Sequence, residues 1–544
     1  RKGEDMTGSA RTGSGDFDVL ILGAEVLDGT GREGYAGDVG LKGDKIAAVE
    51  RAGRLEGARE GTAAGGGEVV EGRGLTLCPG FIDAHSHSDA YLLLEPSAAS
   101  KVMQGVTTEI TGNCGASAAP RLPGYRMPSD WAAQRYPREW GSVADYRAAL
   151  EEARPAVNSR MLVGHRTIRA AVTGEASRAA TPDEVRKMVR LMEQALDEGG
   201  GGMSTGLVYA PAMFAAREEL VALAAAAGRA GGVYATHMRS EGARLLEGIA
   251  EALEIGREAG VPVQISHLKT SGKANWGKVE AALAAIGAAR SAGQDVAADR
   301  YPYTASCTDL DILLPEWAGQ GGREAILGRL RDAGTRARIL REVREERSED
   351  YWEGVRIGFT RHAGWAGRKL VEFAKERGLD GAEAMVTLID EDGLGTMGIF
   401  GGMCEDNMRR IWREPWVMGG SDASIRAPWG PLGEDFPHPR AYGTFGAWWR
   451  MGREPGGLGL AETVRKCTSL PAKRFGLKGR GEIRAGAYAD VLLLRADEFR
   501  DEATYGEPHR FCTGLREMWI NGVRTVRDVK LTGERGGRYL DLRG

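Results

Sequence analysis

The stretch PGFIDAHSHSD, residues Pro79–Asp89, is a short apolar run that ends in two histidines one residue apart. Because side chains alternate between the two faces of a β-strand, His85 and His87 point to the same side of this run. Two neighbouring imidazoles suit a metal ion, although a solvated or structural role explains a single such pair equally well. The meaning of this stretch therefore depends on how the other strand-like runs of the chain end.

Seven further strand-like runs follow, separated by Ala- and Glu-rich segments that are typical of helices. One such segment, residues 181–200, begins with a Thr N-cap and a Pro in the first helical position. This alternation predicts an α/β fold with a parallel sheet, and eight strands is the number that closes a (β/α)₈ TIM-like barrel. The eight runs are GFIDAHSH (80–87), GVTTEITGNC (105–114), SRMLVGH (159–165), GGMSTG (201–206), GVYATH (232–237), VPVQISH (261–267), QDVAAD (294–299) and WVMGGSD (416–422).

Most of these runs end in a residue that can bind a metal. In a (β/α)₈ barrel the carboxyl ends of the strands meet in one small volume, so such residues converge even when they are far apart in the sequence. Taken singly, a strand-end His is more often a core residue, and an Asp often caps a helix. As a set, nitrogen, sulfur and oxygen donors suit zinc. The candidate ligands are His85, His87, Cys114, His237, His267 and Asp422.

The two ends of the chain have a different pattern. Short strand-like runs with turn residues between them occupy residues 16–79 and recur in residues 480–544, so we expect both segments to form one small β-sandwich domain. The barrel is expected over residues 80–479. It is interrupted at about 301–400 by an insertion with a charged helical segment, which we expect to lie near the barrel mouth.

Bulk composition excludes several classes of partner. The 544 residues carry 72 Lys and Arg against 76 Asp and Glu, a net charge of −4, so we expect no nucleic acid and no anionic membrane surface as partner. The six cysteines show no disulfide framework, and we find neither a signal peptide nor a membrane-spanning run. The prediction is a cytoplasmic protein that acts on a small molecule.

A family resemblance rests on motifs spread over nearly the whole chain. They are PGFIDAHSHSD (79–89), GVTTEITGNCG (105–115), MSTGLVYAP (203–211), ATHMRSEG (235–242), ISHLK (265–269), GSD (420–422), HPRAYGTF (438–445), TSLPAKRFGL (468–477) and GEIRAGAYADV (481–491). Together these motifs resemble the amidohydrolase superfamily, and within it the D-aminoacylase, or N-acyl-D-amino-acid deacylase, group.

The resemblance implies a role for each metal ligand. His85 and His87 match the pair that binds one metal position, and His237 and His267 match the histidines of the other. Cys114 matches a cysteine that bridges the two positions in this group, where most of the superfamily has a carboxylated lysine. A soft thiolate favours zinc, and one or two zinc ions are expected.

The resemblance also implies the catalytic and substrate-binding residues. Asp422 matches the catalytic aspartate, which takes a proton from the attacking water and passes it to the leaving amine. Lys269 and Arg440 match cations that bind the substrate carboxylate, and Tyr301 or Tyr303 could add a hydrogen bond. Without the motifs, Lys269 reads as a solvated charge and Arg440 as a loop residue tied to a helix end.

The implied activity is zinc-dependent removal of the N-acyl group from an N-acyl-D-amino acid. Leu268 stands where some relatives have a second histidine, and the loop between Asp422 and Arg440 leaves the substrate preference open. The alternatives are a related amidohydrolase that acts on a cyclic amide, a dipeptide or a larger N-acylated metabolite, and, from another class, a non-catalytic ligand-binding barrel. His165 has no role in the motifs, and we expect it to pack. The sequence does not indicate an oligomeric state.

Overall fold

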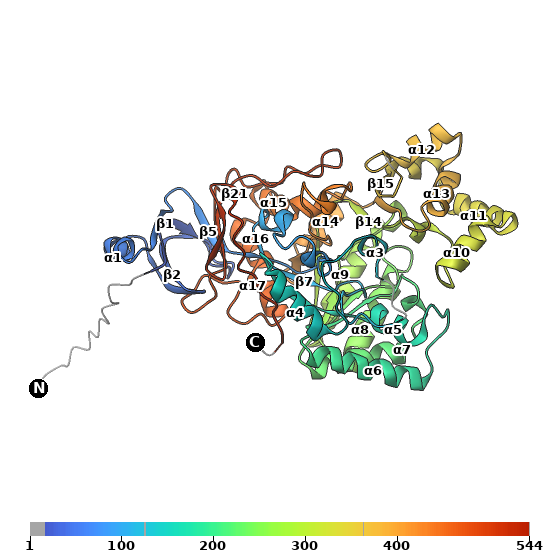
Figure 1. The fold of residues 1–544 in the computed structure, drawn as a ribbon, viewed down its shortest axis with the longest axis horizontal. Coiled ribbons are helices and arrows are strands. Elements are labelled where there is room, and N and C mark those ends of the chain that lie inside the picture. The colour runs from blue at the N-terminus through green and yellow to red at the C-terminus, as the bar shows by residue number, and fades with distance from the viewer. Residues whose placement is uncertain (1–16, 124–126, 363, 543–544) are drawn as a thin grey trace, which may run out of the picture.

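The computed structural model describes residues 17–123, 127–362 and 364–542. These residues form a sheet built from both ends of the chain, a barrel, and a helical insertion (Figure 1). In Figure 1 the terminal sheet lies at the left, the barrel at the centre and lower right, and the insertion at the upper right. The barrel therefore lies between the other two parts.

All strands of the barrel are parallel. Six form one sheet in the order β17-β13-β12-β11-β10-β9, and three form a second in the order β6-β7-β8. β8 and β9 are a single run interrupted at Leu162, and a bridge between Ser86 and Ala423 joins β6 to β17. The strands are β6 (Phe81–Asp83), β7 (Val106–Thr111), β8 (Asn158–Met161), β9 (Val163–Gly164), β10 (Gly202–Gly206), β11 (Val233–His237), β12 (Val263–Ile265), β13 (Val296–Arg300) and β17 (Val417–Gly419). The predicted eight-stranded barrel is confirmed.

Helices follow the barrel strands, as the sequence pattern predicts. The helix α6 begins as expected, because the Thr181 side chain accepts a hydrogen bond from the Glu184 backbone N–H and Glu184 reaches back to the N–H of Thr181. The helices outside the insertion are α1 (Arg59–Ala64), α2 (Ala99–Val102), α3 (Ser129–Ala132), α4 (Val143–Ala153), α5 (His165–Thr173), α6 (Pro182–Asp197), α7 (Arg217–Arg229), α8 (Leu245–Ala259), α9 (Val279–Ser291), α14 (Glu405–Trp412), α15 (Arg440–Arg453), α16 (Leu460–Cys467) and α17 (Ser469–Arg474).

The terminal sheet joins strands from the two ends of the chain. Its order is β21-β20-β19-β18-β5-β1-β2-β3, with β4 paired to β1. The strand β18 contributes to two apolar cores, because successive side chains point to opposite faces of a strand. Val491 and Leu493 pack in the core of the terminal sheet, whereas Leu492 and Leu494 pack in the core of the barrel. The strands are β1 (Val19–Val26), β2 (Tyr35–Lys42), β3 (Lys45–Arg51), β4 (Glu68–Glu71), β5 (Thr76–Pro79), β18 (Val491–Leu494), β19 (Leu515–Ile520), β20 (Val523–Arg527) and β21 (Lys530–Leu531). The domain boundaries given above stay a prediction.

The insertion leaves the barrel between β13 and β17. It has a three-stranded antiparallel sheet in the order β14-β16-β15 and a core of its own, which includes Trp352, Phe373 and Met385. Its elements are β14 (Ala305–Asp309), α10 (Gly322–Arg331), α11 (Ala333–Glu346), β15 (Val355–Phe359), α12 (Leu370–Arg377), α13 (Gly381–Glu391) and β16 (Met397–Gly401). Because both ends of the insertion are fixed at the carboxyl-end side of the barrel, it stands beside the barrel mouth.

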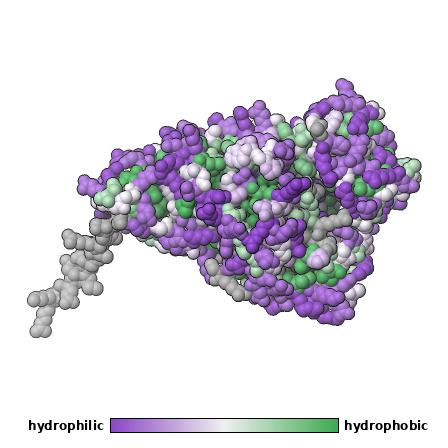
Figure 2. All heavy atoms as spheres, in the orientation of Figure 1, coloured by the Kyte–Doolittle hydropathy of each residue, from purple (hydrophilic) through white to green (hydrophobic). Residues whose placement is uncertain are grey.

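The surface is largely polar. Hydrophilic residues cover most of the face shown in Figure 2, and apolar residues appear there in small separate areas. Within the part of the chain that the structure describes, we find no helix with the length and apolar character needed to cross a membrane.

A buried polar network ties the terminal sheet to the barrel. Arg480 forms an ion pair with Asp490 and donates a hydrogen bond of 2.8 Å to Oδ1 of Asn521. Asn521 in turn donates to Oδ1 of Asn158 in β8 at 2.7 Å. The side chains of Arg480 and Asp490 are 3% and 4% exposed, so their charges compensate each other without water.

Replacement of Arg480 by Met should lower the free energy of unfolding by about 3–5 kcal/mol, because Asp490 then becomes a buried charge without a partner of opposite sign. Urea unfolding followed by tryptophan fluorescence measures the loss. Arg484→Met is the matched control, since Arg484 is 55% exposed and lies 3.5 Å from its carboxylate partner Glu482. Equal stability of the two variants would contradict the prediction.

Candidate metal centre

The barrel brings the six predicted ligands together at the carboxyl ends of its strands. His85 and His87 follow β6, Cys114 follows β7, and His237 is the last residue of β11. The other two, His267 and Asp422, lie just after β12 and β17. Their donor atoms form two groups, and within each group the atoms lie within 4.8 Å of one another. The groups are His85, His87, Cys114 and Asp422, and Cys114, His237 and His267.

The first group gathers four donors around one point. Oδ1 of Asp422 lies 3.0 Å from Nε2 of His87 and 3.3 Å from Nε2 of His85. Nε2 of His85 also lies 3.3 Å from Sγ of Cys114. Two ring nitrogens, a thiol sulfur and a carboxylate oxygen therefore face one another, and three of the four residues are buried.

The second group shares Cys114 with the first. Its sulfur lies 3.4 Å from Nε2 of His267, and the rings of His267 and His237 meet edge to face with centroids 4.5 Å apart. The thiol of Cys114 is thus the one donor that belongs to both groups. The motif resemblance predicts a bridging role for Cys114, and its place in both groups is what that role requires.

The two groups fit zinc. Zinc binds thiolate sulfur at about 2.3 Å and imidazole nitrogen at about 2.0–2.1 Å in tetrahedral geometry, which places neighbouring ligand atoms about 3.3–3.6 Å apart. The distances from Sγ of Cys114 to the two histidine nitrogens, 3.3 and 3.4 Å, agree with this spacing. The mixture of soft sulfur with nitrogen and oxygen also matches zinc better than magnesium or calcium.

Three of the six residues have a backbone conformation that non-glycine residues rarely adopt. The φ angles of Cys114, His267 and Asp422 are 52°, 36° and 52°. Such left-handed conformations cost on the order of 1–3 kcal/mol each, and they cluster at functional sites. Each of the three strands therefore turns sharply at its end, which directs the side chain into the centre of the barrel mouth.

Near Cys114 the backbone segments after β7 and at the end of β10 lie so close together that only glycine fits at Gly115 and Gly206. A Cβ atom on Gly206, at the end of β10, would lie 2.2 Å from the carbonyl oxygen of Cys114, and one on Gly115 would lie 2.7 Å from the backbone nitrogen of Gly206. This contact explains why the GGMSTG run alone ends in glycine. Gly206 lets the backbone of Cys114 pack against the end of β10, and this strand end supplies no candidate metal ligand.

The electrostatics favour an ionised thiol and an ionised carboxyl. Burial alone would raise the pKa of the Cys114 thiol, but the adjacent His85 and His267 hold that pKa well below its usual range. Burial is likewise outweighed at Asp422, whose pKa is held well below its usual range by Arg440 and His267. The thiolate and the carboxylate are the forms in which these groups bind metals.

Both predicted substrate-binding cations lie at the edge of this cluster. Nη1 of Arg440 lies 2.8 Å from Oδ2 of Asp422, and the guanidinium lies 4.7 Å from the ring centroid of Tyr301. Nζ of Lys269 lies 5.8 Å from the same centroid. The Tyr301 hydroxyl is buried and makes no hydrogen bond to another described residue. Arg440 and Lys269 therefore both pack against Tyr301, and Arg440 also contacts Asp422.

Tyr303 and His165 lie apart from this arrangement. The Tyr303 hydroxyl lies against α15, where a Cβ atom on Gly443 would meet it at 2.5 Å, and its ring packs on His438. His165 is buried, and its Nε2 atom lies 2.7 Å from Oε1 of Glu219. This is the packing role expected for His165, whereas the hydroxyl of Tyr303 is directed away from the metal groups.

Two carboxylates next to the ligands were missed in the sequence. Oδ1 of Asp299 lies 3.0 Å from Nδ1 of His85, and Oε1 of Glu241 lies 2.8 Å from Nδ1 of His267. Such partners fix the orientation of an imidazole ligand. A signal was present in both cases, because Asp299 closes the QDVAAD run and Glu241 follows His237 by four residues.

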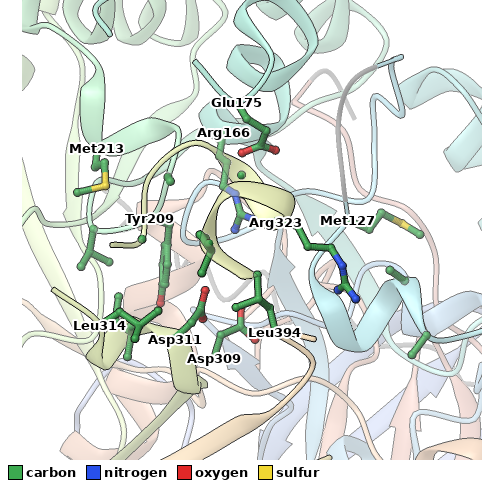
Figure 3. A pocket seen from close by; sticks show the side chains of 18 of the residues that line it. Met127, Arg166, Glu175, Tyr209, Met213, Asp309, Asp311, Leu314, Arg323 and Leu394 are labelled. Atoms are coloured by element: carbon green, nitrogen blue, oxygen red, sulfur yellow. The ribbon is translucent and has the colours of Figure 1, made fainter. Parts of the chain in front are cut away.

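A cavity of about 1300 Å³ lies beside Tyr209, and the residues that line it include none of the six candidate ligands. Loops from the barrel and the first part of the insertion line it, and Figure 3 shows Tyr209 beside Asp309 and Asp311 within it. The ring of Tyr209 is 5.2 Å from that of His237, so the Tyr209 side chain contacts both this cavity and the second donor group. The insertion forms one wall of the cavity.

Comparison with known proteins agrees with the fold and the site. The model of the amidohydrolase family matches residues 68–526. D-aminoacylase of Alcaligenes xylosoxydans xylosoxydans is 35% identical over 533 residues, which cover 98% of this chain and 99% of that protein. A crystal structure of D-aminoacylase superposes with a TM-score of 0.81 at 35% identity, over 96% of this chain and all of the other.

A second solved structure is similar to the same degree. It is N-acyl-D-glutamate deacylase from Bordetella bronchiseptica, complexed with zinc and a phosphonate inhibitor that mimics the tetrahedral intermediate. Its TM-score is 0.82 at 31% identity, and the match covers 97% of this chain and all of that chain. These matches cover nearly the whole chain, so the chain belongs to the amidohydrolase family.

Proposed function

We propose that this protein is a zinc-dependent amide hydrolase that removes the N-acyl group from N-acyl-D-amino acids and releases a carboxylate and a free D-amino acid. The observation that carries the proposal is the thiol of Cys114 shared between two donor groups, with Asp422 and Arg440 directly beside them. The relatives named as D-aminoacylase and N-acyl-D-glutamate deacylase support the choice of substrate. We place the enzyme in the cytoplasm, where a thiol ligand stays reduced.

The residues that would hold zinc are the two donor groups described above, for one or two ions. When bound there, zinc supplies a Lewis acid that lowers the pKa of a water and polarises the amide carbonyl. His85 and His87 would offer ring nitrogens from one group, and His237 and His267 would offer them from the other. Cys114 belongs to both groups and would offer its thiolate.

Asp422 is proposed to move the proton. Its carboxylate is ionised, so it can accept a proton from the attacking water and then give it to the nitrogen of the leaving amine. Arg440 holds Oδ2 at 2.8 Å, and Oδ1 remains directed at the histidines. The guanidinium therefore fixes which oxygen of Asp422 faces the reaction.

Lys269 and Arg440 are proposed to bind the carboxylate of the substrate. Both side chains are almost fully buried, so an anion between them is attracted in an environment that water screens weakly. The Tyr301 hydroxyl lacks a partner among the described residues and is suited to donate to the same anion. Tyr303 is left out, because its hydroxyl lies against α15.

A second candidate is hydrolysis of a larger N-acylated metabolite by the same residues. The cavity of about 1300 Å³ supports it, because the cavity lies next to the second donor group through Tyr209 and has room for a larger group attached to the amide. The chemistry would be unchanged, and only the groups attached to the amide would differ. A panel of short and long N-acyl groups on one D-amino acid separates the two candidates.

The zinc-loaded protein should hydrolyse N-acetyl-D-amino acids at least tenfold faster in kcat/KM than their L-enantiomers. Amine release from matched pairs with neutral, acidic and basic side chains measures this ratio. Removal of zinc with a chelator should abolish the activity, and added zinc should restore it. Zinc-loaded protein that turns over no D-substrate, or prefers the L-series, would contradict the proposal.

Cys114→Ala should lower zinc content and activity together, because the variant loses the one donor that both metal positions share. Metal analysis after gel filtration and a kinetic assay on the same sample provide the two readouts. Cys404→Ala is the control, since Cys404 lies in the loop before α14 and belongs to neither donor group. A Cys114→Ala protein with full zinc content and full activity would refute the role of the thiolate.

Asp422→Asn should lower kcat by about 10²- to 10⁴-fold, the usual effect of losing a general acid and base. Single-turnover assays on zinc-saturated protein measure the chemical step directly. Glu434→Gln, in the loop between Asp422 and Arg440, tests whether loss of an exposed charge there matters. Retention of most activity by Asp422→Asn would assign the proton transfer to another group.

A further inference from the structure

One buried carboxylate contacts both a proposed metal ligand and a proposed substrate-binding cation. Oε1 of Glu241 lies 2.8 Å from Nδ1 of His267 and 2.6 Å from Nζ of Lys269. Nζ of Lys269 also lies 2.6 Å from Nδ1 of His267. Because the three side chains are at most 13% exposed, water competes little with these contacts.

The chemistry of the three groups allows only one arrangement that leaves His267 able to bind a metal. An ammonium only donates hydrogen bonds and a carboxylate only accepts them, whereas Nδ1 of a neutral imidazole does either. If Nε2 of His267 offers its lone pair to a metal, the ring proton must be on Nδ1. Nδ1 then donates to Glu241, and Lys269 must donate to Glu241 as well.

We propose that Glu241 is a positioning residue that keeps Nδ1 of His267 in the donor role and at the same time holds Lys269 beside the site. Glu241 prevents Lys269 from donating to Nδ1, which would move the ring proton to Nε2 and remove the ligand. The substrate-related half of this inference rests on the function proposed above. The half that concerns the tautomer of His267 depends only on the donor group.

The position of Glu241 in the chain suits this role. Glu241 lies in the loop after β11, four residues beyond His237, and Oε2 lies 3.8 Å from Nε2 of that histidine. The backbone carbonyl of Glu241 accepts a hydrogen bond of 2.8 Å from the N–H of Ser271, in the loop after β12. The loop that follows His237 thus contacts this ligand and also orients the ligand that follows the next strand.

Burial of Glu241 is compensated by these same contacts. The ammonium of Lys269 lies 2.6 Å from Oε1, and Nδ1 of His267 lies 2.8 Å from the same oxygen, so two donors meet one carboxylate oxygen. An amide at this position would accept more weakly and would leave Lys269 free to donate to Nδ1.

The test measures zinc binding by competition with a chromophoric chelator, with zinc as the only ligand. In Glu241→Gln, which keeps the shape of the side chain, the dissociation constant of one zinc equivalent should rise by about 10- to 100-fold. Glu247→Gln is the matched control, because Glu247 is exposed in the first turn of α8, and it should bind zinc as the wild type does. Equal zinc affinity of Glu241→Gln and Glu247→Gln would overturn the proposal.

A double variant separates this mechanism from a merely structural role. If Lys269 captures Nδ1 when Glu241 is neutral, removal of the ammonium should restore the ligand. Zinc affinity of Glu241→Gln/Lys269→Met should therefore return to within about threefold of Lys269→Met alone. A double variant that binds zinc no more tightly than Glu241→Gln would refute the competition.

A kinetic readout tests the link to the substrate. In zinc-saturated Glu241→Gln, KM for an N-acyl-D-amino acid should rise several-fold, because Lys269 has lost its anchor. An unchanged KM would overturn this half of the inference. Failure of the proposed function has a different signature, because the wild type would then hydrolyse no such substrate, while the zinc affinities would still decide the role of Glu241.

Discussion

The structure depends on one close approach of backbone, at the point where the ends of the barrel strands meet around Cys114. Gly115 and Gly206 have no room for a Cβ atom there, and Cys114 itself adopts a left-handed conformation. This crowding brings a single sulfur within 3.4 Å of histidines from two other strands. A larger residue at either glycine would separate the strand ends and, with them, the two donor groups.

The crowded site is also an arrangement of alternating charges. Buried groups of one sign are tolerable only when groups of the opposite sign contact them, because water is excluded. Imidazoles separate the negative groups in this cluster, and each of its two lines of neighbours ends in a cation. Read across the site, the neighbours are Asp299, His85, Cys114, His267, Glu241 and Lys269 in one line, and His87, Asp422 and Arg440 in another. The site is therefore one connected network, and the loss of one member changes the environment of the others.

The candidate metal ligands and the neighbouring cavity come from different parts of the chain. Among the described residues the barrel supplies the candidate metal ligands, whereas the insertion between β13 and β17 supplies one wall of the cavity beside Tyr209. The insertion has its own core, so its cavity-facing residues, such as Asp309 and Asp311, can change without disturbing the strand ends.

The sequence by itself determined the barrel and the six candidate ligands, because both depend on local pattern. An apolar run that ends in His, Cys or Asp places that residue at a strand end, and parallel strands bring their ends together whatever their separation in the chain. Only the tertiary structure decided which side chains touch there. It paired Asp299 with His85, which lies 214 residues earlier, tied Glu241 to His267 and Lys269, and turned the Tyr303 hydroxyl toward α15. Such contacts depend on how loops from different strands pack, and the pattern of residues within one strand does not predict them.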